Sequence, residues 1–425
     1  MDHTQRAGLR LEPFPGVFYN VRRPGAASAF VTTSTKVEEA VRQTSDVLAT
    51  LPPHHVLRLV MPPEGSDHTD SGRLLRVWLS RGVLRVDTRP ALYAYEQREP
   101  SGAVLSGLIG ALRGGPHSTD GVAPHEDVAA HAVDRLATML AGLRADVEPL
   151  MLWYRGTGTV ASVIAAATER PALLEAITDR GTVHRLWPVT DEREIEAAQR
   201  ELAASRAVIA DGHHRFSAHT QLREDAQAHR RLAGFWDHSL ALLVDTEQHP
   251  MTPHAFHHVI REVPLAGALE RLGPAHPYEV CEGTLATALA RLADLRDHRV
   301  ALLSDGEQHC LIRLGPTSAE TDLTDAEVAR RRLFPRLHGN AATRTERIGS
   351  AAQVVAEAAD VGGVAVLLNP PDEADIRRAA LAGRRLPRKS TYFPLKPPLG
   401  LVMRVHMSPE PQTMKEERCP TLPPN

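Results

Sequence analysis

A short apolar run in the middle of this chain leads directly into a polar turn and then into a helix. Residues 207–210 predict a buried strand, and residues 216–230 predict a helix. The five residues that join them are Asp211, Gly212, His213, His214 and Arg215. A helix that begins this close to a strand presents the free N–H groups of its first turn and the positive end of its dipole. We therefore expect an anion-binding turn, of the kind that holds phosphate groups, in an α/β protein.

The residue types of this turn suit a phosphate ligand. Gly212 lets the backbone approach a bulky anion closely, and Arg215 can bind two phosphate oxygens at once. His213 and His214 add donors that titrate near neutral pH. Asp211 can bind Mg²⁺ or orient one of the histidines. The alternative is a simple helix cap with exposed histidines, but this combination directly after a buried strand favours a functional site.

A second candidate follows a glycine-rich segment. Residues 114–124 predict a loop, and His125 and Glu126 stand just before a predicted helix. A carboxylate at this place can act as a general base or as a metal ligand. It can equally be an acidic residue that the helix dipole favours. The sequence leaves both interpretations open.

The third candidate is a basic segment near the C-terminus. The chain has only four lysines, and two of them, Lys389 and Lys396, lie within eight positions of each other. Ser390 and Thr391 stand between them, and prolines flank the segment. Cationic and hydroxyl donors in a backbone that is poor in internal hydrogen bonds suit a clamp for phosphate or carboxylate. A solvated basic loop is the alternative.

Two further patterns are weaker. Gly156 and Gly158 fit the form G-x-G-x-x-A of dinucleotide-binding proteins, but no βαβαβ repeat surrounds them. His254, His257 and His258 have the spacing of one helical face, which would suit a metal ion. No fourth ligand is evident, so a polar strand–helix junction is the better interpretation. The sequence has neither a P-loop motif nor an esterase elbow.

The rest of the chain alternates between helix and strand. Strands are predicted for residues 55–61, 91–96, 104–112, 150–154 and 240–245, and helices for residues 160–177 and 191–205. This alternation predicts a mixed α/β (α+β) fold. The predicted parts are an N-terminal α/β part at 1–120, a phosphate-binding core at 121–260, a C-terminal α/β part at 261–405 and a disordered tail at 406–425.

Composition limits the class of protein. The net charge of −3 counts against a dedicated nucleic-acid binder. The chain has no apolar run of about 18 residues, so no membrane span is expected. Its N-terminus lacks the apolar segment of a signal peptide, and its three cysteines are too scattered for a disulfide framework. We expect a cytoplasmic protein, and the sequence does not predict an oligomeric state.

Several segments, in this order, resemble the family called domain of unknown function 1015. They are residues 124–126 with the helix after them, residues 150–154, the pentapeptide at 211–215, and residues 386–393. Residues 1–60 match the family poorly. The pentapeptide in turn resembles the phosphate-binding turn of the ParB/sulfiredoxin-like superfamily. One branch of that superfamily, the free-serine kinases, phosphorylates L-serine with ADP or ATP and uses a glutamate as base.

This resemblance implies a ParB/sulfiredoxin-like core and a phosphotransferase that uses ATP or ADP with Mg²⁺ and acts on a small hydroxylated metabolite. Glu126 would be the base, and His214 and Arg215 would act on the transferred phosphoryl group. The nucleotide would be bound by Asp211, Gly212, His213, His214 and Arg215, and the acceptor by His125, Lys389, Ser390 and Thr391. Two alternatives are open: a non-catalytic nucleotide-binding or regulatory protein of ParB-like type, and a nicotinamide-dependent oxidoreductase built on Gly156 and Gly158.

Overall fold

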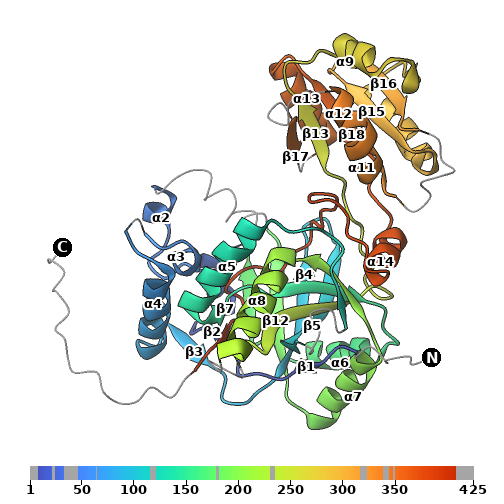
Figure 1. The fold of residues 1–425 in the computed structure, drawn as a ribbon. Coiled ribbons are helices and arrows are strands. Elements are labelled where there is room, and N and C mark those ends of the chain that lie inside the picture. The colour runs from blue at the N-terminus through green and yellow to red at the C-terminus, as the bar shows by residue number, and fades with distance from the viewer. Residues whose placement is uncertain are drawn as a thin grey trace.

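The computed structural model shows a mixed α/β protein, as predicted (Figure 1). It describes residues 8–21, 24–32, 46–63, 65–114, 121–178, 181–229, 235–315, 323–337, 344–347 and 350–407. Two main sheets, one of nine strands and one of six, organise the chain. Within the described ranges, none of the helices is long and apolar enough to cross a membrane.

The larger sheet carries the predicted anion-binding turn. Its strands are β1 (Leu11–Glu12), β4 (Leu92–Arg98), β5 (Val104–Arg113), β6 (Val122–Ala123), β8 (Leu150–Tyr154), β9 (Leu174–Ile177), β10 (Val183–Val189), β11 (Ala207–Asp211) and β12 (His238–Asp245). They follow the order β6-β11-β8-β12-β5-β4-β10-β9, and β1 pairs with β5. Strand β11 is parallel to β6 and β12 is parallel to β8, whereas the other pairs are antiparallel. The predicted strands at 91–96 and 104–112 do pair, as β4 and β5.

Strand β8 is apolar throughout because both faces of the sheet are buried there. Its alternate residues belong to two cores: Met151 and Trp153 to one, and Leu150, Leu152 and Tyr154 to the other. Helices α6 (Thr159–Thr168) and α7 (Glu192–Ala203) pack on the second core. Helix α4 (His68–Ser80) contributes to the first. Strand β11 pairs with β8, so the turn that follows β11 starts from a rigid, buried part of the molecule.

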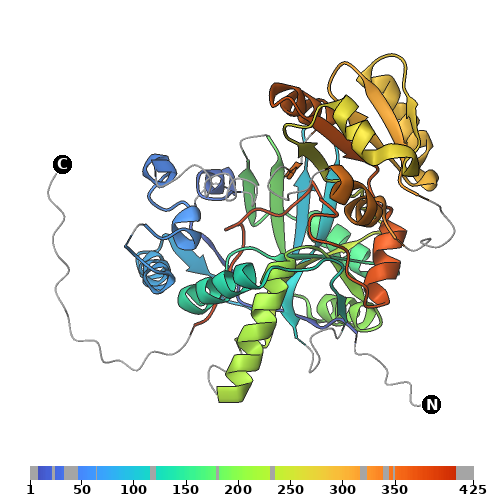
Figure 2. The ribbon, with the colours of Figure 1, turned by 45° about the horizontal axis from the view of Figure 1, so that its top comes forward.

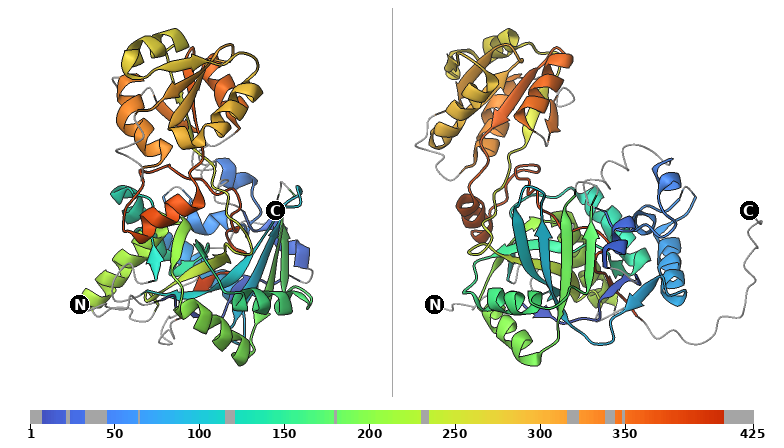
Figure 3. Two further views of the ribbon diagram at one scale, coloured as in Figure 1. Left: turned by 90° about the vertical axis from the view of Figure 1, so that its right-hand side faces the viewer. Right: turned by 180° about the vertical axis from the view of Figure 1, so that it is seen from behind.

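The smaller sheet forms a second lobe, which Figures 1 and 3 show above the larger sheet. Its strands are β13 (His257–Ile260), β14 (Tyr278–Val280), β15 (Val300–Ser304), β16 (His309–Arg313), β17 (Arg344–Arg347) and β18 (Val364–Leu368). All of its pairs are antiparallel, in the order β14-β16-β15-β18-β13-β17. Helices α9 (Leu265–Leu272), α10 (Leu285–Asp294) and α13 (Ala351–Asp360) pack on it.

After the second lobe and helix α14 (Glu373–Leu381), the chain returns to the first lobe. We call residues 384–405 the C-terminal strap; it is drawn in dark red in Figure 2. The strap makes isolated bridges from Leu386 to Glu126, from Tyr392 to His254 and from Leu399 to Thr32. It ends in β19 (Arg404–Val405), which pairs with β7 (Ala145–Asp146). Segments from both ends of the chain therefore meet over the larger sheet.

Two predicted elements are wrong. Residues 55–61, predicted as a strand, contain helix α3 (Leu57–Val60). The Arg58 guanidinium donates to three carbonyls of residues 48–52 and so folds this segment back on itself. The helix predicted over 160–177 ends at Thr168, because Pro171 cannot continue it, and β9 follows.

Helix α7 agrees with its prediction, since the Asp191 carboxylate caps it by accepting from the N–H groups of Arg193 and Glu194. The larger sheet draws its strands from residues 11–245 and the smaller from residues 257–368. The predicted boundaries and the ParB-like core stay predictions. The predicted tail lies outside the described residues from residue 408 onward.

Candidate functional site

The polar turn has the geometry of an anion site. The register of β11 against β8 shifts between Ile209 and Asp211, and Gly212 then adopts a φ of 99°. This positive φ favours glycine, and a Cβ atom here would also lie 2.9 Å from a methyl carbon of Leu150. Helix α8 (His213–His229) begins at the next residue. The N–H of Phe216 donates to Gly212 at 2.8 Å, so the N–H groups of residues 213–215 precede the first intrahelical bond.

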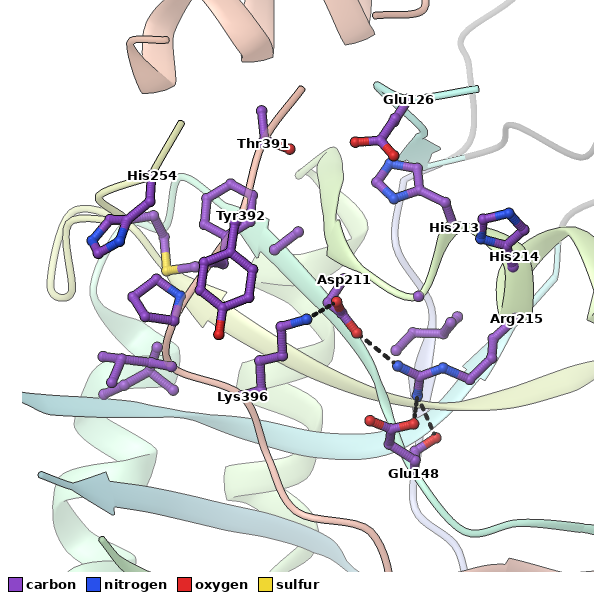
Figure 4. Close-up of a pocket in the computed structure, with 18 of the residues that line it drawn as sticks. Glu126, Glu148, Asp211, His213, His214, Arg215, His254, Thr391, Tyr392 and Lys396 are labelled. Carbon is purple, nitrogen blue, oxygen red and sulfur yellow. Dashed lines mark hydrogen bonds and ion pairs between the residues drawn. The ribbon is translucent and has the colours of Figure 1, made fainter. Parts of the chain in front are cut away.

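This turn opens into a cleft of about 1550 Å³ that residues of both lobes line. The larger lobe contributes the whole turn together with Glu126 and Glu148, and the strap contributes Lys389, Thr391 and Lys396. Phe256 and Arg347 come from the smaller lobe and the segment that leads to it. Figure 4 shows the labelled side chains of this wall. A cleft between two lobes with convergent polar groups is the usual form of a small-molecule site.

A chain of four charged side chains runs along the cleft wall (Figure 4). Lys396 Nζ lies 2.5 Å from Asp211 Oδ1, and Asp211 Oδ2 accepts from Arg215 Nη2 at 2.9 Å. Arg215 Nη1 in turn lies 3.2 Å from Glu148 Oε2. It also donates to the carbonyl oxygens of Glu148 and Pro149, at 3.0 and 2.7 Å. The predicted phosphate ligand Arg215 is thus engaged by two carboxylates and two carbonyls of its own chain.

Asp211 is ionised in this chain. Burial opposes its charge, but the Lys396 and Arg215 cations outweigh burial and hold the pKa of Asp211 below its ordinary value. Both oxygens already face a cation, so a divalent ion would place three cations around one carboxylate. Among the described residues, no group of three or more His, Cys, Asp or Glu side chains is placed to hold a metal ion. Because Mg²⁺ is commonly held by one or two carboxylates together with substrate phosphates, the predicted role of Asp211 as its ligand stays a prediction.

The two histidines of the turn are acceptors. His213 Nε2 accepts from the backbone N–H of His125 at 3.3 Å, and His214 Nε2 accepts from the N–H of Ala129 at 3.1 Å. Because an N–H can only donate, both Nε2 atoms are unprotonated. Burial lowers the pKa of both imidazoles, so both are neutral at pH 7. Their side chains fasten the segment that carries Glu126 to the start of α8.

Glu126 is the titratable group best suited to proton transfer. Burial raises the pKa of its carboxyl to about 7, although the backbone N–H of Lys389 donates to Oε1 at 2.9 Å and opposes this rise. The side chain lies beside His213 at the cleft wall (Figure 4). A carboxylate with a pKa near the working pH is matched to general base catalysis.

The predicted acceptor residues have different positions. Lys389 adopts a φ of 60°, in the left-handed region, and its Nζ lies 5.4 Å from the ring centroid of Phe256 in the cleft. Thr391 also lines the cleft, and its Oγ1 lies 2.8 Å from Nε2 of the buried His125. The Ser390 hydroxyl is buried and donates to the carbonyl of Pro387 at 2.6 Å, so it faces its own turn.

Gly156 and Gly158 precede the N-terminus of α6, whose first N–H groups already donate to a side chain of the protein. The Glu201 carboxylate accepts from the N–H groups of Thr159 and Val160, at 2.7 and 3.3 Å, and from the hydroxyl of Thr157. These contacts lower the pKa of Glu201 against the opposing effect of burial. An internal carboxylate thus occupies the place that a dinucleotide pyrophosphate would need.

The histidines at 254–258 do not share a helical face. His257 and His258 lie on strand β13, where neighbouring side chains point to opposite faces. His258 packs edge-on against the ring of Phe334, and His257 Nδ1 lies 3.4 Å from the N–H of Leu368. The helical spacing that suggested a metal site is therefore absent from this segment, because His257 and His258 lie on a strand.

Sequence reasoning missed Glu148. Nothing around this residue distinguishes it, because its partner Arg215 lies 67 positions along the chain. The sequence singled out Lys396 as one of two clustered lysines. Its contact with Asp211 could not be predicted, because the two residues lie 185 positions apart.

Fold and site together define a two-lobed α/β protein in which the start of a helix and a buried carboxylate line one cleft. Comparison with protein families shows which group this is. The model of the family described as "Protein of unknown function (DUF1015)" matches residues 11–330, and the chain belongs to this family. No match is found among curated proteins.

Several solved structures are weakly similar. One is a mutant free serine kinase in complex with ADP, with a TM-score of 0.36 and 12% identity over 67% of this chain and 90% of that one. Another is a conserved hypothetical protein from Pyrococcus furiosus, with a TM-score of 0.34 and 13% identity over 66% of this chain and 90% of that one. A third is SbnI with a C-terminal truncation from Staphylococcus aureus, with a TM-score of 0.36 and 8% identity over 67% of this chain and 82% of that one. These similarities are too low to transfer the role of any residue.

Proposed function

We propose that this protein is a nucleotide-dependent phosphotransferase that acts on a small hydroxylated metabolite. One observation carries the proposal: a helix start that can bind phosphate and the Glu126 carboxyl, with a pKa of about 7, line the same cleft. Phosphoryl transfer needs these two elements, a positioned phosphate and a base for the acceptor hydroxyl. The resemblance of the pentapeptide to that of free-serine kinases makes L-serine the first acceptor to test.

In the proposed reaction, the acceptor oxygen forms a bond to the terminal phosphorus of ATP or ADP. The bond from that phosphorus to the bridging oxygen breaks, and the shortened nucleotide leaves with the electron pair. The acceptor's proton passes to the Glu126 carboxylate. The N–H groups at the start of α8 bind phosphate oxygens, and Lys389 and Thr391, on the strap beside Glu126 and His125, bind the charged end of the acceptor.

Nucleotide binding is expected to raise the thermal unfolding midpoint. ADP or ATP at a hundred times its dissociation constant should add about 2.7 kcal/mol to the free energy of unfolding, because it binds only the native protein. The measurement is a thermal unfolding series with ATP, ADP, adenosine and NAD⁺. A shift with NAD⁺ alone would move the site to the helix after Gly158, and no shift with any nucleotide would contradict the proposal. Binding without turnover of any hydroxylated acceptor would favour a regulatory, ParB-like protein.

Activity is expected to rise with pH up to about 7. Glu126 accepts a proton only when ionised, so kcat/KM should fall about tenfold per pH unit below its pKa of about 7. The contribution of Glu126 to stability should change in the opposite direction. Between the ordinary pKa of 4.5 and about 7, the folded state keeps a proton on Glu126 that the unfolded state releases, so raising the pH lowers this contribution to the free energy of unfolding. Rates and denaturant midpoints of the wild type and of Glu126→Gln, measured from pH 4.5 to 9, check both signs, because their difference separates Glu126 from the buried histidines, whose lowered pKa values act in the other direction. An activity that is flat below pH 7 would exclude Glu126 as the base.

A further inference from the structure

We propose that Lys396, rather than Arg215, is the side chain that binds the nucleotide phosphates, and that it moves from Asp211 to the phosphate when the nucleotide binds. This inference rests on the proposed function and names the cation of its phosphate site. It starts from the difference between the two cations that share Asp211.

Arg215 is fixed from several sides. Its two terminal nitrogens contact the carboxylates of Asp211 and Glu148 and the carbonyls of Glu148 and Pro149. The guanidinium also passes close to Gly212, with Nη2 only 3.3 Å from the position of a Cβ atom there. Turning this group toward a ligand would leave two partly buried carboxylates without their shared cation. Its contacts suit a brace that holds β11, α8 and residues 148–149 together.

Lys396 is held differently. Its one ion pair among the described residues is with Asp211, and Nζ otherwise lies 5.1 Å from the ring centroid of Tyr392. The side chain is 15% exposed and lines the cleft. The strap is bridged on both sides of Lys396, from Tyr392 to His254 in the segment that leads to the second lobe and from Leu399 to Thr32. The backbone is therefore fixed, while an ammonium on a four-carbon stem can reorient about its own bonds.

The order of the charged side chains along the cleft wall also favours Lys396 over Arg215 as the phosphate-binding cation. It runs Lys396, Asp211, Arg215, Glu148, so Arg215 has a carboxylate on each side and Lys396 has one on a single side. A phosphate at the start of α8 would lie beside Asp211, which immediately precedes Gly212, and two anions there repel each other. A cation between them removes this repulsion. Lys396 stands next to Asp211 and can supply that cation by giving up one ion pair, whereas Arg215 would give up two.

The test is calorimetric titration of wild type, Lys396→Met and Lys396→Arg with ADP, AMP and adenosine. Loss of one charge-assisted contact should weaken ADP binding about 10- to 100-fold in Lys396→Met. Adenosine has no phosphate, so its affinity should not change, and it serves as the internal control. Lys396→Arg keeps the charge and should recover most of the ADP affinity.

A purely structural lysine would behave differently. Lys396→Met would then lower the unfolding midpoint of the free protein and leave the ratio of ADP to adenosine affinity at its wild-type value, which would overturn the inference. Asp211→Asn provides a second test of the inference if Lys396→Met folds poorly. This variant removes the carboxylate that competes with the phosphate for Lys396, so ADP should bind at least as tightly as in the wild type. Weaker binding would contradict the proposed movement of Lys396 from Asp211 to the phosphate. Failure of the wild-type protein itself to bind ADP would instead overturn the proposed function.

Discussion

Replacement of Glu126 by glutamine is expected to lower kcat by about 10²- to 10⁴-fold, the usual contribution of a positioned general base. Glutamine keeps the shape of the side chain and can still accept from the N–H of Lys389, which donates to the carboxylate at 2.9 Å. It cannot take a proton from an acceptor hydroxyl. Nucleotide affinity should stay close to that of the wild type, because the start of α8 is unchanged. The measurement is steady-state phosphorylation of L-serine, or of another hydroxylated acceptor that the wild type uses.

Glu99→Gln provides the matched control. Glu99 lines the same cleft and contacts Gln97 and Thr182 by hydrogen bonds that glutamine can partly keep. Its carboxylate has no part in the proposed reaction, so kcat should be nearly unchanged. Equal losses in the two variants would mean that the effect at Glu126 is a general change of the cleft and not the loss of a base.

Replacement of Arg215 by methionine is expected to reduce the free energy of unfolding by about 3–5 kcal/mol, the usual effect of removing one partner of a buried ion pair. Asp211 would keep Lys396, but Glu148 would lose its ion pair with Arg215 and two carbonyl groups would lose a donor. The arginine side chain is only 13% exposed, so water screens little of this loss. Urea unfolding followed by circular dichroism measures it.

Arg155→Met is the corresponding surface substitution. Arg155 is half exposed and pairs with Glu247 and Glu373 at 3.5 and 3.9 Å, so its loss should cost about 1 kcal/mol or less. If Arg215→Met kept wild-type stability and lost only nucleotide binding, Arg215 would be a phosphate ligand as the sequence suggested, and its role as a brace would be refuted.

The strand, turn and helix around Gly212 could be predicted because the signals are local. An apolar run, a residue that tolerates positive φ and a following stretch without proline or glycine lie within about 25 residues of sequence. The mixed α/β class followed from the same kind of evidence. Helix α3 could not be predicted, since a single turn has no period and Arg58 stabilises it through contacts with the preceding turn.

The roles of the side chains were harder to predict than the elements. His213 and Arg215 have the right chemistry for a phosphate, but their partners, His125 and Glu148, lie 88 and 67 positions away. Sequence reasoning assigned them as if they were free, whereas the structure uses their hydrogen-bonding capacity internally. Glu126 was named as a base from its position and from the family resemblance, and the burial that raises its pKa could not be predicted, because its contact with Lys389 of the returning strap spans 263 positions.

The strap also determines when this site can form. The contacts from Lys389 to Glu126 and from Lys396 to Asp211 span 263 and 185 positions, and the whole second lobe lies between the segments that they join. Contacts of such long sequence separation carry a large loop-closure entropy and are slow to form. During synthesis, the N-terminal lobe can begin to fold while Asp211 and Glu126 still lack their partners. A chain that stops before residue 389 would contain every strand of both main sheets but not the finished cleft, so the growing polypeptide cannot bind a ligand there until the strap has been synthesised.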